Sequence, residues 1–190
     1  ASLRSVFDLA PVLFMFFIPA LTMGTFAEER RAGTIELLLT LPVRDGQVIA
    51  AKLLSVVIVL VVALALTGVY VLTLAVLGDP DNGGTLGGYL GLALLGLSCS
   101  ALGLLASSLT RNQIVAFILG FAMIFGLYLL DKVTIFAPGW LAPILEYLSI
   151  DFHYRNLMRG VIDSRDVLYY LSLTAFAGLL TAYHLARRPE

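Results

Sequence analysis

The chain has 190 residues, of which 59% are hydrophobic and 13% are charged, whereas soluble domains carry about 45–50% apolar and about 25% charged residues. Its 12 basic and 13 acidic residues give a net charge of −1 and form no basic stripe, so the composition excludes a soluble domain and argues against binding to nucleic acid. A single cysteine, Cys99, excludes an intrachain disulfide and a multi-cysteine metal site.

Apolar stretches of membrane-spanning length recur along the chain. A bilayer core roughly 30 Å thick needs about 20 apolar residues per helix. The stretches that meet this test are about 6–26, 53–77, 87–109, 113–130 and 167–186. Pro11 and Pro19 predict a kink in the first of these stretches. Proline is tolerated in a membrane helix because neighbouring helices can satisfy the freed carbonyls. We therefore expect an all-α fold, a polytopic transmembrane helical bundle that forms a single domain over residues 1–190.

The segment 27–52 begins with charged residues and then predicts a short helix. Thr34 can cap a helix whose first turn contains Glu36, and Pro42 prevents that helix from running beyond about two turns. Asp45 can cap the next helix in the same way. A short and strongly apolar helix cannot span the membrane, so we expect it at the cytoplasmic interface or docked on a protein.

Small residues recur at helical spacing in the third predicted span. They lie on two neighbouring stripes that comprise Gly88, Gly96 and Ser100, and Cys99, Gly103 and Ser107. Four-residue spacing of small side chains lets helix backbones approach closely in lipid. We expect this helix to pack through Gly88, Gly96, Ser100 and Gly103, either within the bundle or at a dimer interface.

The segment 131–166 before the last span is polar and aromatic. Its Trp140 is typical of a loop at headgroup level. The segment therefore predicts an extracytoplasmic interfacial element, which either forms a gate for substrate exit or anchors the chain at the membrane surface. Candidate substrate contacts are Tyr147, Phe152, His153, Tyr154 and Arg155.

Basic residues predict the topology, since they remain on the cytoplasmic side of the membrane. They place 27–52, 110–112 and the C-terminal tail inside and 78–86 outside. The segment 131–166 has four basic residues among five acidic ones and is ambiguous by this rule, so alternation of the spans places it outside. Ala1 would then lie outside without a preceding signal segment. We therefore expect a further upstream helix and six spans in the complete protein; a five-span protein with a translocated N-terminus is the alternative.

The segment 27–52 resembles a known family. The segment has a charged pair, then the run Gly33-Thr34-Ile35-Glu36-Leu37-Leu38-Leu39-Thr40, then Pro42, and finally Lys52 at the start of an apolar helix. This order of features resembles the permease subunits of type-2 ABC transporters. The gliding-motility and nitrous-oxide-reductase-accessory branches are nearest. In that family this segment is a coupling helix that docks on a separate ATPase subunit. The residues that the resemblance implies for this contact are Glu28, Glu29, Arg30, Gly33, Thr34, Glu36, Leu37, Leu38 and Pro42.

The resemblance implies a permease, active in export, in the cytoplasmic (inner) membrane of a bacterium or archaeon. It would contact lipid, an ABC ATPase and a second permease copy, as a homodimer or heterodimer. Because the chain has no Gly-x-x-x-x-Gly-Lys-Ser/Thr loop, ATP and Mg²⁺ are expected on the partner. We expect this chain to bind no cofactor or metal and to have no enzyme activity of its own.

A secondary carrier or channel is the alternative function. Ion-coupled carriers usually place an ionisable group at membrane depth, and 53–77, 87–109 and 113–130 contain none. A membrane-embedded enzyme would need a catalytic constellation that the sequence does not show.

Overall fold

The computed structural model describes residues 4–34, 45–77 and 82–186, and within these ranges the fold is helical without strands. The long helices are α1 (Arg4–Thr22), which continues into α2 (Gly24–Ala32), α4 (Asp45–Leu77), α5 (Asn82–Ser108), α6 (Gln113–Val133) and α9 (Ser164–Ala186). The short ones are η1 (Thr134–Phe136), α7 (Ala142–Leu148) and α8 (Ile150–Met158). Among the described residues, 5 helices are long and apolar enough to cross a membrane, which confirms the predicted all-α bundle with five spans.

The first membrane helix runs further than its apolar stretch. After a break at Met23 it continues as α2 through the charged cluster and ends at Gly33. Charged residues are compatible with a helix, whereas a glycine at φ 71° forms the left-handed cap that ends one. The cluster of Glu28 and its neighbours therefore extends the helix beyond the predicted span.

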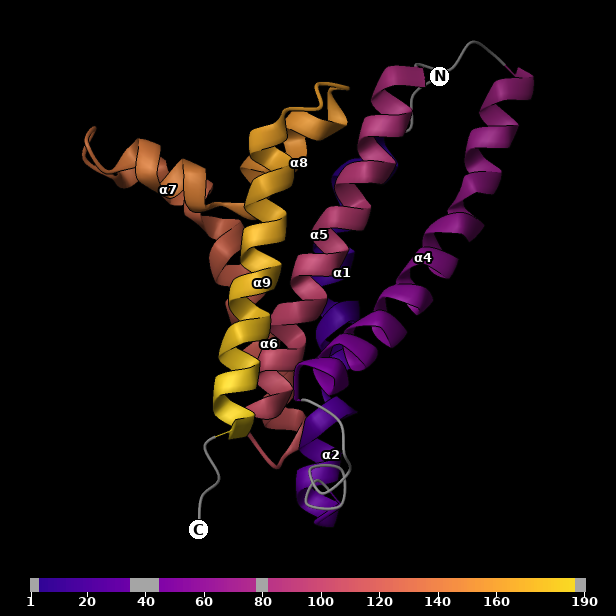
Figure 1. Ribbon diagram of the computed structural model, residues 1–190. Helices are drawn as coiled ribbons and strands as arrows, with labels where there is room; N and C mark the ends of the chain where they lie inside the picture. Colours follow the sequence, from indigo (N-terminus) through magenta and orange to yellow (C-terminus); the bar gives the residue numbers. More distant parts are fainter. Residues whose placement is uncertain (1–3, 35–44, 78–81, 187–190) are drawn as a thin grey trace.

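Helix α5 lies at the centre of the bundle and contacts α1, α4, α6, α8 and α9 (Figure 1). Of its most apolar window, 78% is buried, against 17% for each of α4, α6 and α9. Helix α4 lies against the bundle in its N-terminal part and diverges from the other helices toward its C-terminal end (Figure 1). Because lipid solvates apolar side chains, helices around a buried centre can expose leucine and valine without penalty.

Glycines on α5 provide the room for this central position. A Cβ at Gly88 would lie 2.5 Å from the ring of Phe7 in α1, and one at Gly103 would overlap the Thr22 hydroxyl. A Cβ at Gly96 would overlap Leu60 of α4. Ser100, fully buried, donates a hydrogen bond to the Gly96 carbonyl at 2.6 Å. These contacts lie within one chain.

The tightest approach involves Gly87, where α5 meets α8. A Cβ there would overlap the backbone carbonyl oxygen of Leu157 and lie 3.1 Å from Gly160 Cα. Because backbone atoms cannot rotate away, we expect Gly87→Ala to lower the free energy of unfolding by about 1–3 kcal/mol. Titration with sodium dodecyl sulfate in mixed micelles, followed by circular dichroism, measures this change. Gly68→Ala is the matched control, since its Cβ would meet open space on α4; equal stability of the two variants would contradict the expectation.

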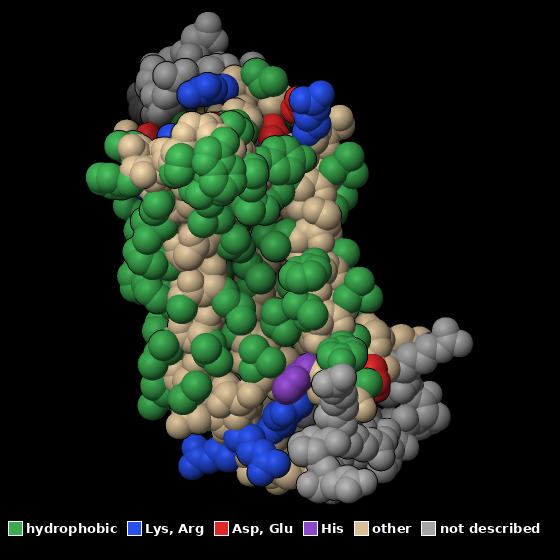
Figure 2. Space-filling model, turned by 90° about the vertical axis from the view of Figure 1, so that its left-hand side faces the viewer, with side chains coloured by type: hydrophobic (Ala, Val, Ile, Leu, Met, Phe, Trp, Pro, Cys, Tyr) green, Lys and Arg blue, Asp and Glu red, His purple; other side chains and the backbone are tan. Residues whose placement is uncertain are grey.

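The surface has the pattern of a membrane protein. A broad hydrophobic band separates two ends where charged side chains gather (Figure 2). One end, here the α2 end, contains α2, the connection between α5 and α6, and the C-terminal end of α9; the opposite end, the α8 end, contains η1, α7 and α8 (Figure 1). Successive long helices that the structure describes run in alternating directions between these two ends (Figure 1).

Candidate functional site

The predicted ATPase-contacting residues lie at the α2 end where the structure describes them. Glu28, Gly33 and Thr34 are exposed, whereas Glu29 and Arg30 are half-buried. Glu36, Leu37, Leu38 and Pro42 lie outside the described residues. The structure therefore describes the two helices on either side of the predicted coupling helix.

A serine of α5 holds α2 in place. Ser107 Oγ accepts hydrogen bonds from the amides of Phe26 and Ala27, each at 3.0 Å, and donates one to the Met23 carbonyl at 2.9 Å. Phe26, Ala27 and Ser107 are fully buried. Amides at the start of a helix have no partner within it, so Ser107 satisfies them at the break between α1 and α2 and links α2 to the central helix.

Lys52 connects α4 to α2. Its ammonium lies 2.6 Å from Glu29 Oε1, donates to the Thr25 carbonyl, and lies 4.7 Å from the centre of the Phe26 ring. Phe26 also belongs to a buried apolar cluster with Ile49 and Leu104. The Lys52 side chain is only 18% exposed, so an ion pair and a cation–π contact act together in a partly desolvated place. We call this set of contacts the Lys52 bridge.

Thr34 contributes to the C-terminal end of α2. Its amide donates to the Glu29 carbonyl at 3.0 Å, and its hydroxyl reaches the same oxygen at 3.4 Å. With Gly33 in the left-handed conformation, both groups close α2. In the structure, Thr34 thus caps the preceding helix at its C-terminal end; the following helix that it was expected to begin lies outside the described residues.

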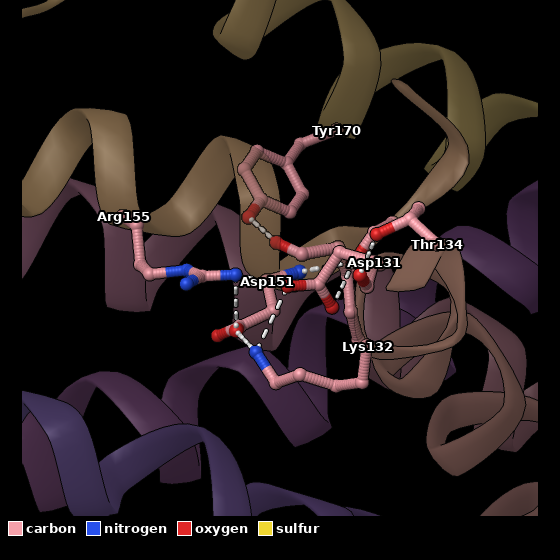
Figure 3. Close-up of polar contacts among 8 residues, drawn as sticks. Asp131, Lys132, Thr134, Asp151, Arg155 and Tyr170 are labelled. Carbon is pink, nitrogen blue, oxygen red and sulfur yellow. Dashed lines mark hydrogen bonds and ion pairs between the residues drawn. The ribbon is translucent and has the colours of Figure 1, made fainter. Parts of the chain in front are cut away.

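Four charged side chains form a network at the α8 end (Figure 3). Lys132 lies 2.9 Å from Asp131 and 2.7 Å from Asp151, and Arg155 pairs with both carboxylates. The two carboxylates are 6% and 9% exposed. Buried carboxylates need such partners, so the network joins the end of α6 to α8 with no net charge.

A second buried pair joins α7, α8 and α9. His153 Nδ1 lies 2.6 Å from Asp166 Oδ1, and Nε2 lies 2.8 Å from the Tyr147 carbonyl oxygen. A carbonyl oxygen can only accept, so Nε2 carries the proton that it donates to Tyr147. The ring of Tyr169 stacks on the imidazole with centroids 4.0 Å apart.

The candidate substrate contacts therefore divide into two groups. His153 and Tyr154 are each 1% exposed, and Tyr154 donates a hydrogen bond to the Phe7 carbonyl at 2.9 Å. Burial and the nearby Asp8 carboxylate raise the pKa of Tyr154, so its hydroxyl stays protonated for this bond. The prediction of substrate contact is wrong for these two residues, because both hold α8 in the fold. Phe152 and Arg155 line a cavity instead, and Tyr147 is exposed on α7, where its ring meets the His153 ring edge-on.

Sequence reasoning missed the roles of Ser107, Lys52 and Asp166. Ser107 was noted only as a small residue, although a hydroxyl near the end of an apolar helix is a signal for a backbone contact. Lys52 entered only as a basic residue at the start of an apolar helix, without a partner. Asp166 lies in the first turn of α9, where the helix dipole favours any acidic residue. Its position in the sequence therefore did not indicate that it pairs with His153.

The geometry defines a multi-pass membrane protein with organised polar contacts at both ends. Among the described residues no group of three His, Cys, Asp or Glu could hold a metal. Residues 4–185 match the family described as "ABC-2 family transporter protein", and the chain belongs to this family. No curated protein and no solved structure matched the chain in two further comparisons. Family membership confirms the resemblance to ABC-2 permeases and makes the chain a transport subunit, which is not itself catalytic.

Proposed function

We propose that this permease subunit moves its substrate with energy from a separate ABC ATPase, and that residues 28–47 dock on that partner. The Lys52 bridge is the observation that supports this best. It ties α2 and α4 together directly at the two ends of the predicted coupling segment. A force applied between residues 33 and 45 would therefore act on both helices at once.

Two connections would carry such a force into the membrane. Ser107 links α2 to the buried α5 through three hydrogen bonds, and α4 is one continuous helix from Asp45 to Leu77. Movement of the coupling segment would therefore change the angle between α4 and α5. Packed interfaces tend to switch between discrete arrangements, which is what alternating access requires.

The space beside α4 supports an apolar or amphipathic substrate. A cavity of about 350 Å³ lies between α1, α4 and α5, and another of about 650 Å³ lies between α4 and α5. Apolar side chains line most of both. The hydroxyls of Thr67 and Tyr89, 3.0 Å apart, provide one polar position there. A second permease copy would enclose this side of α4, completing a path that one chain leaves open.

We also propose export across the cytoplasmic (inner) membrane of a bacterium or archaeon, by a homodimer or heterodimer. ATP and Mg²⁺ would be bound by the ATPase subunits. The nearest branch of the family, gliding motility or nitrous-oxide-reductase accessory, remains a prediction.

Site-directed cross-linking tests the docking surface. Thr34 is exposed and Cys99 is 1% exposed, so a Thr34→Cys variant labelled with benzophenone maleimide carries the probe at residue 34. Illumination of native membranes is expected to link the chain to a protein with a Gly-x-x-x-x-Gly-Lys-Ser/Thr loop, identified by mass spectrometry. Arg165→Cys, exposed at the α8 end, is the control. Cross-linking to an ATPase from residue 165 and not from residue 34 would refute the assignment.

A further inference from the structure

A charged cavity at the α8 end remains unexplained by ATP coupling. It has a volume of about 380 Å³ and lies between the end of α6, α7 and α8. Its lining has three cationic side chains, two carboxylates, two apolar side chains and an amide: Lys132, Arg155, Arg159, Asp131, Glu146, Ile135, Phe152 and Asn156. The size suits a small polar group rather than a macromolecule.

The charges in this cavity are only partly used by the fold. Lys132 and Arg155 neutralise Asp131 and Asp151, yet their side chains remain 41% and 43% exposed. Arg159 has no ion-pair partner among the described residues, and the same holds for Glu146. The cavity thus offers guanidinium donors and one separate carboxylate acceptor. This pattern complements a ligand that carries one negative and one positive group.

The cavity opens beside a strongly apolar surface. Ile135 and Phe136 of η1 are 83% and 87% exposed, and Trp140 is 74% exposed. Ile144 and Leu148 continue this surface on α7, which projects from the bundle in Figure 1. Exposed aromatic residues at the end of a membrane span are typical of headgroup depth. Charged groups therefore lie where headgroups are found, next to side chains that acyl chains can cover.

We propose that this cavity binds the headgroup of a zwitterionic phospholipid with a primary ammonium, the phosphoethanolamine class, from the leaflet at the α8 end. Arg155 and Arg159 bind the phosphate, since guanidinium groups match its geometry. Glu146 accepts hydrogen bonds from the ammonium. A quaternary ammonium could donate none and prefers an aromatic cage, whereas Phe152 is the one aromatic side chain in the lining. The proposal depends on membrane insertion alone and is independent of the ATPase.

Lipid titration of the purified chain, followed by native mass spectrometry, tests the site. The probes are phosphatidylethanolamine, phosphatidylcholine and phosphatidylglycerol with identical acyl chains, and soluble phosphoethanolamine. Wild type is expected to prefer phosphatidylethanolamine. Arg159→Gln is expected to weaken binding of all three lipids at least about tenfold, the effect of losing one charge-assisted hydrogen bond. Glu146→Gln is expected to weaken only phosphatidylethanolamine, to the level of phosphatidylcholine.

The controls separate this site from general lipid adhesion. Arg165→Gln removes an exposed cation at the same end outside the cavity lining, and it is expected to bind lipid as wild type does. Melting curves of Arg159→Gln and Glu146→Gln should match wild type, because both side chains are exposed and without ion pairs among the described residues. Unchanged lipid binding in both variants would overturn the proposal. If wild type preferred phosphatidylglycerol, the cavity would be a site for anionic headgroups. If soluble phosphoethanolamine competed as well as the lipid does, the cavity would be a site for a small molecule. Either result would also overturn the proposal.

Discussion

Asp166→Ala is expected to lower the free energy of unfolding by about 3 kcal/mol, the largest loss of stability that we predict from one side chain. The substitution leaves His153 buried, 1% exposed, without the carboxylate 2.6 Å from its Nδ1. Breaking a buried pair by removing one partner typically costs about 3–5 kcal/mol, and we expect the lower end of this range because His153 Nε2 keeps its bond to the Tyr147 carbonyl. Unfolding in mixed micelles measures the change.

A nearby carboxylate provides the control for this effect. Asp163 is exposed and accepts a hydrogen bond from the Arg165 amide at 3.0 Å at the start of α9. Loss of such a cap costs about 1 kcal/mol. A double-mutant cycle with His153→Ala should show coupling between residues 153 and 166, because they share one interaction. Equal effects at Asp166 and Asp163, or an additive cycle, would show that the buried pair does not stabilise α8 against α9.

Lys52→Met is expected to reduce stimulation of the ATPase, and transport with it, at least about tenfold, which is about 1.4 kcal/mol of coupling free energy. Methionine keeps most of the apolar stem but removes the ammonium that binds Glu29 and the Thr25 carbonyl. Helices α2 and α4 would then move independently when the segment between them is pushed. ATP hydrolysis by the reconstituted complex measures the effect.

The double variant Lys52→Met with Glu29→Gln separates coupling from folding. If Lys52 acts through Glu29, the second substitution should add little to the first. Complex formation should persist in Lys52→Met, because Lys52 lies outside the docking segment 28–47. Full ATPase stimulation by Lys52→Met would mean that the two helices do not need the Lys52 bridge to transmit force.

The membrane spans could be predicted from sequence because the lipid solvent imposes one simple requirement. Each helix must carry about 20 apolar residues, and polar turns mark its ends. The glycines on α5 could be predicted as packing residues for the same reason, since in lipid the helices must be held together by close packing. Gly87 was not among the predicted packing residues, because the α8 backbone that it touches returns from 70 residues further along the chain.

The polar contacts could not be predicted, because their partners come together only in the folded bundle. Ser107 meets Phe26 across 81 residues, and Lys52 meets Glu29 across 23. Asp131 and Arg155 both lie in the segment 131–166, where the sequence shows acidic and basic residues but not which of them pair. Thr34 shows a further limit: a threonine after a glycine can close the helix before it or begin the one after it.

Recovery of an ATPase with the complete permease tests the central claim most directly. The chain would be purified from native membranes in mild detergent, its partners identified by mass spectrometry, and ATP hydrolysis measured for wild type and for Glu28→Lys with Glu36→Lys. We expect an ABC ATPase to copurify with wild type and to be lost, together with its stimulated activity, in the charge-reversed variant. A preparation that transports substrate without any ATPase, or an ATPase complex unaffected by the reversal, would contradict the account.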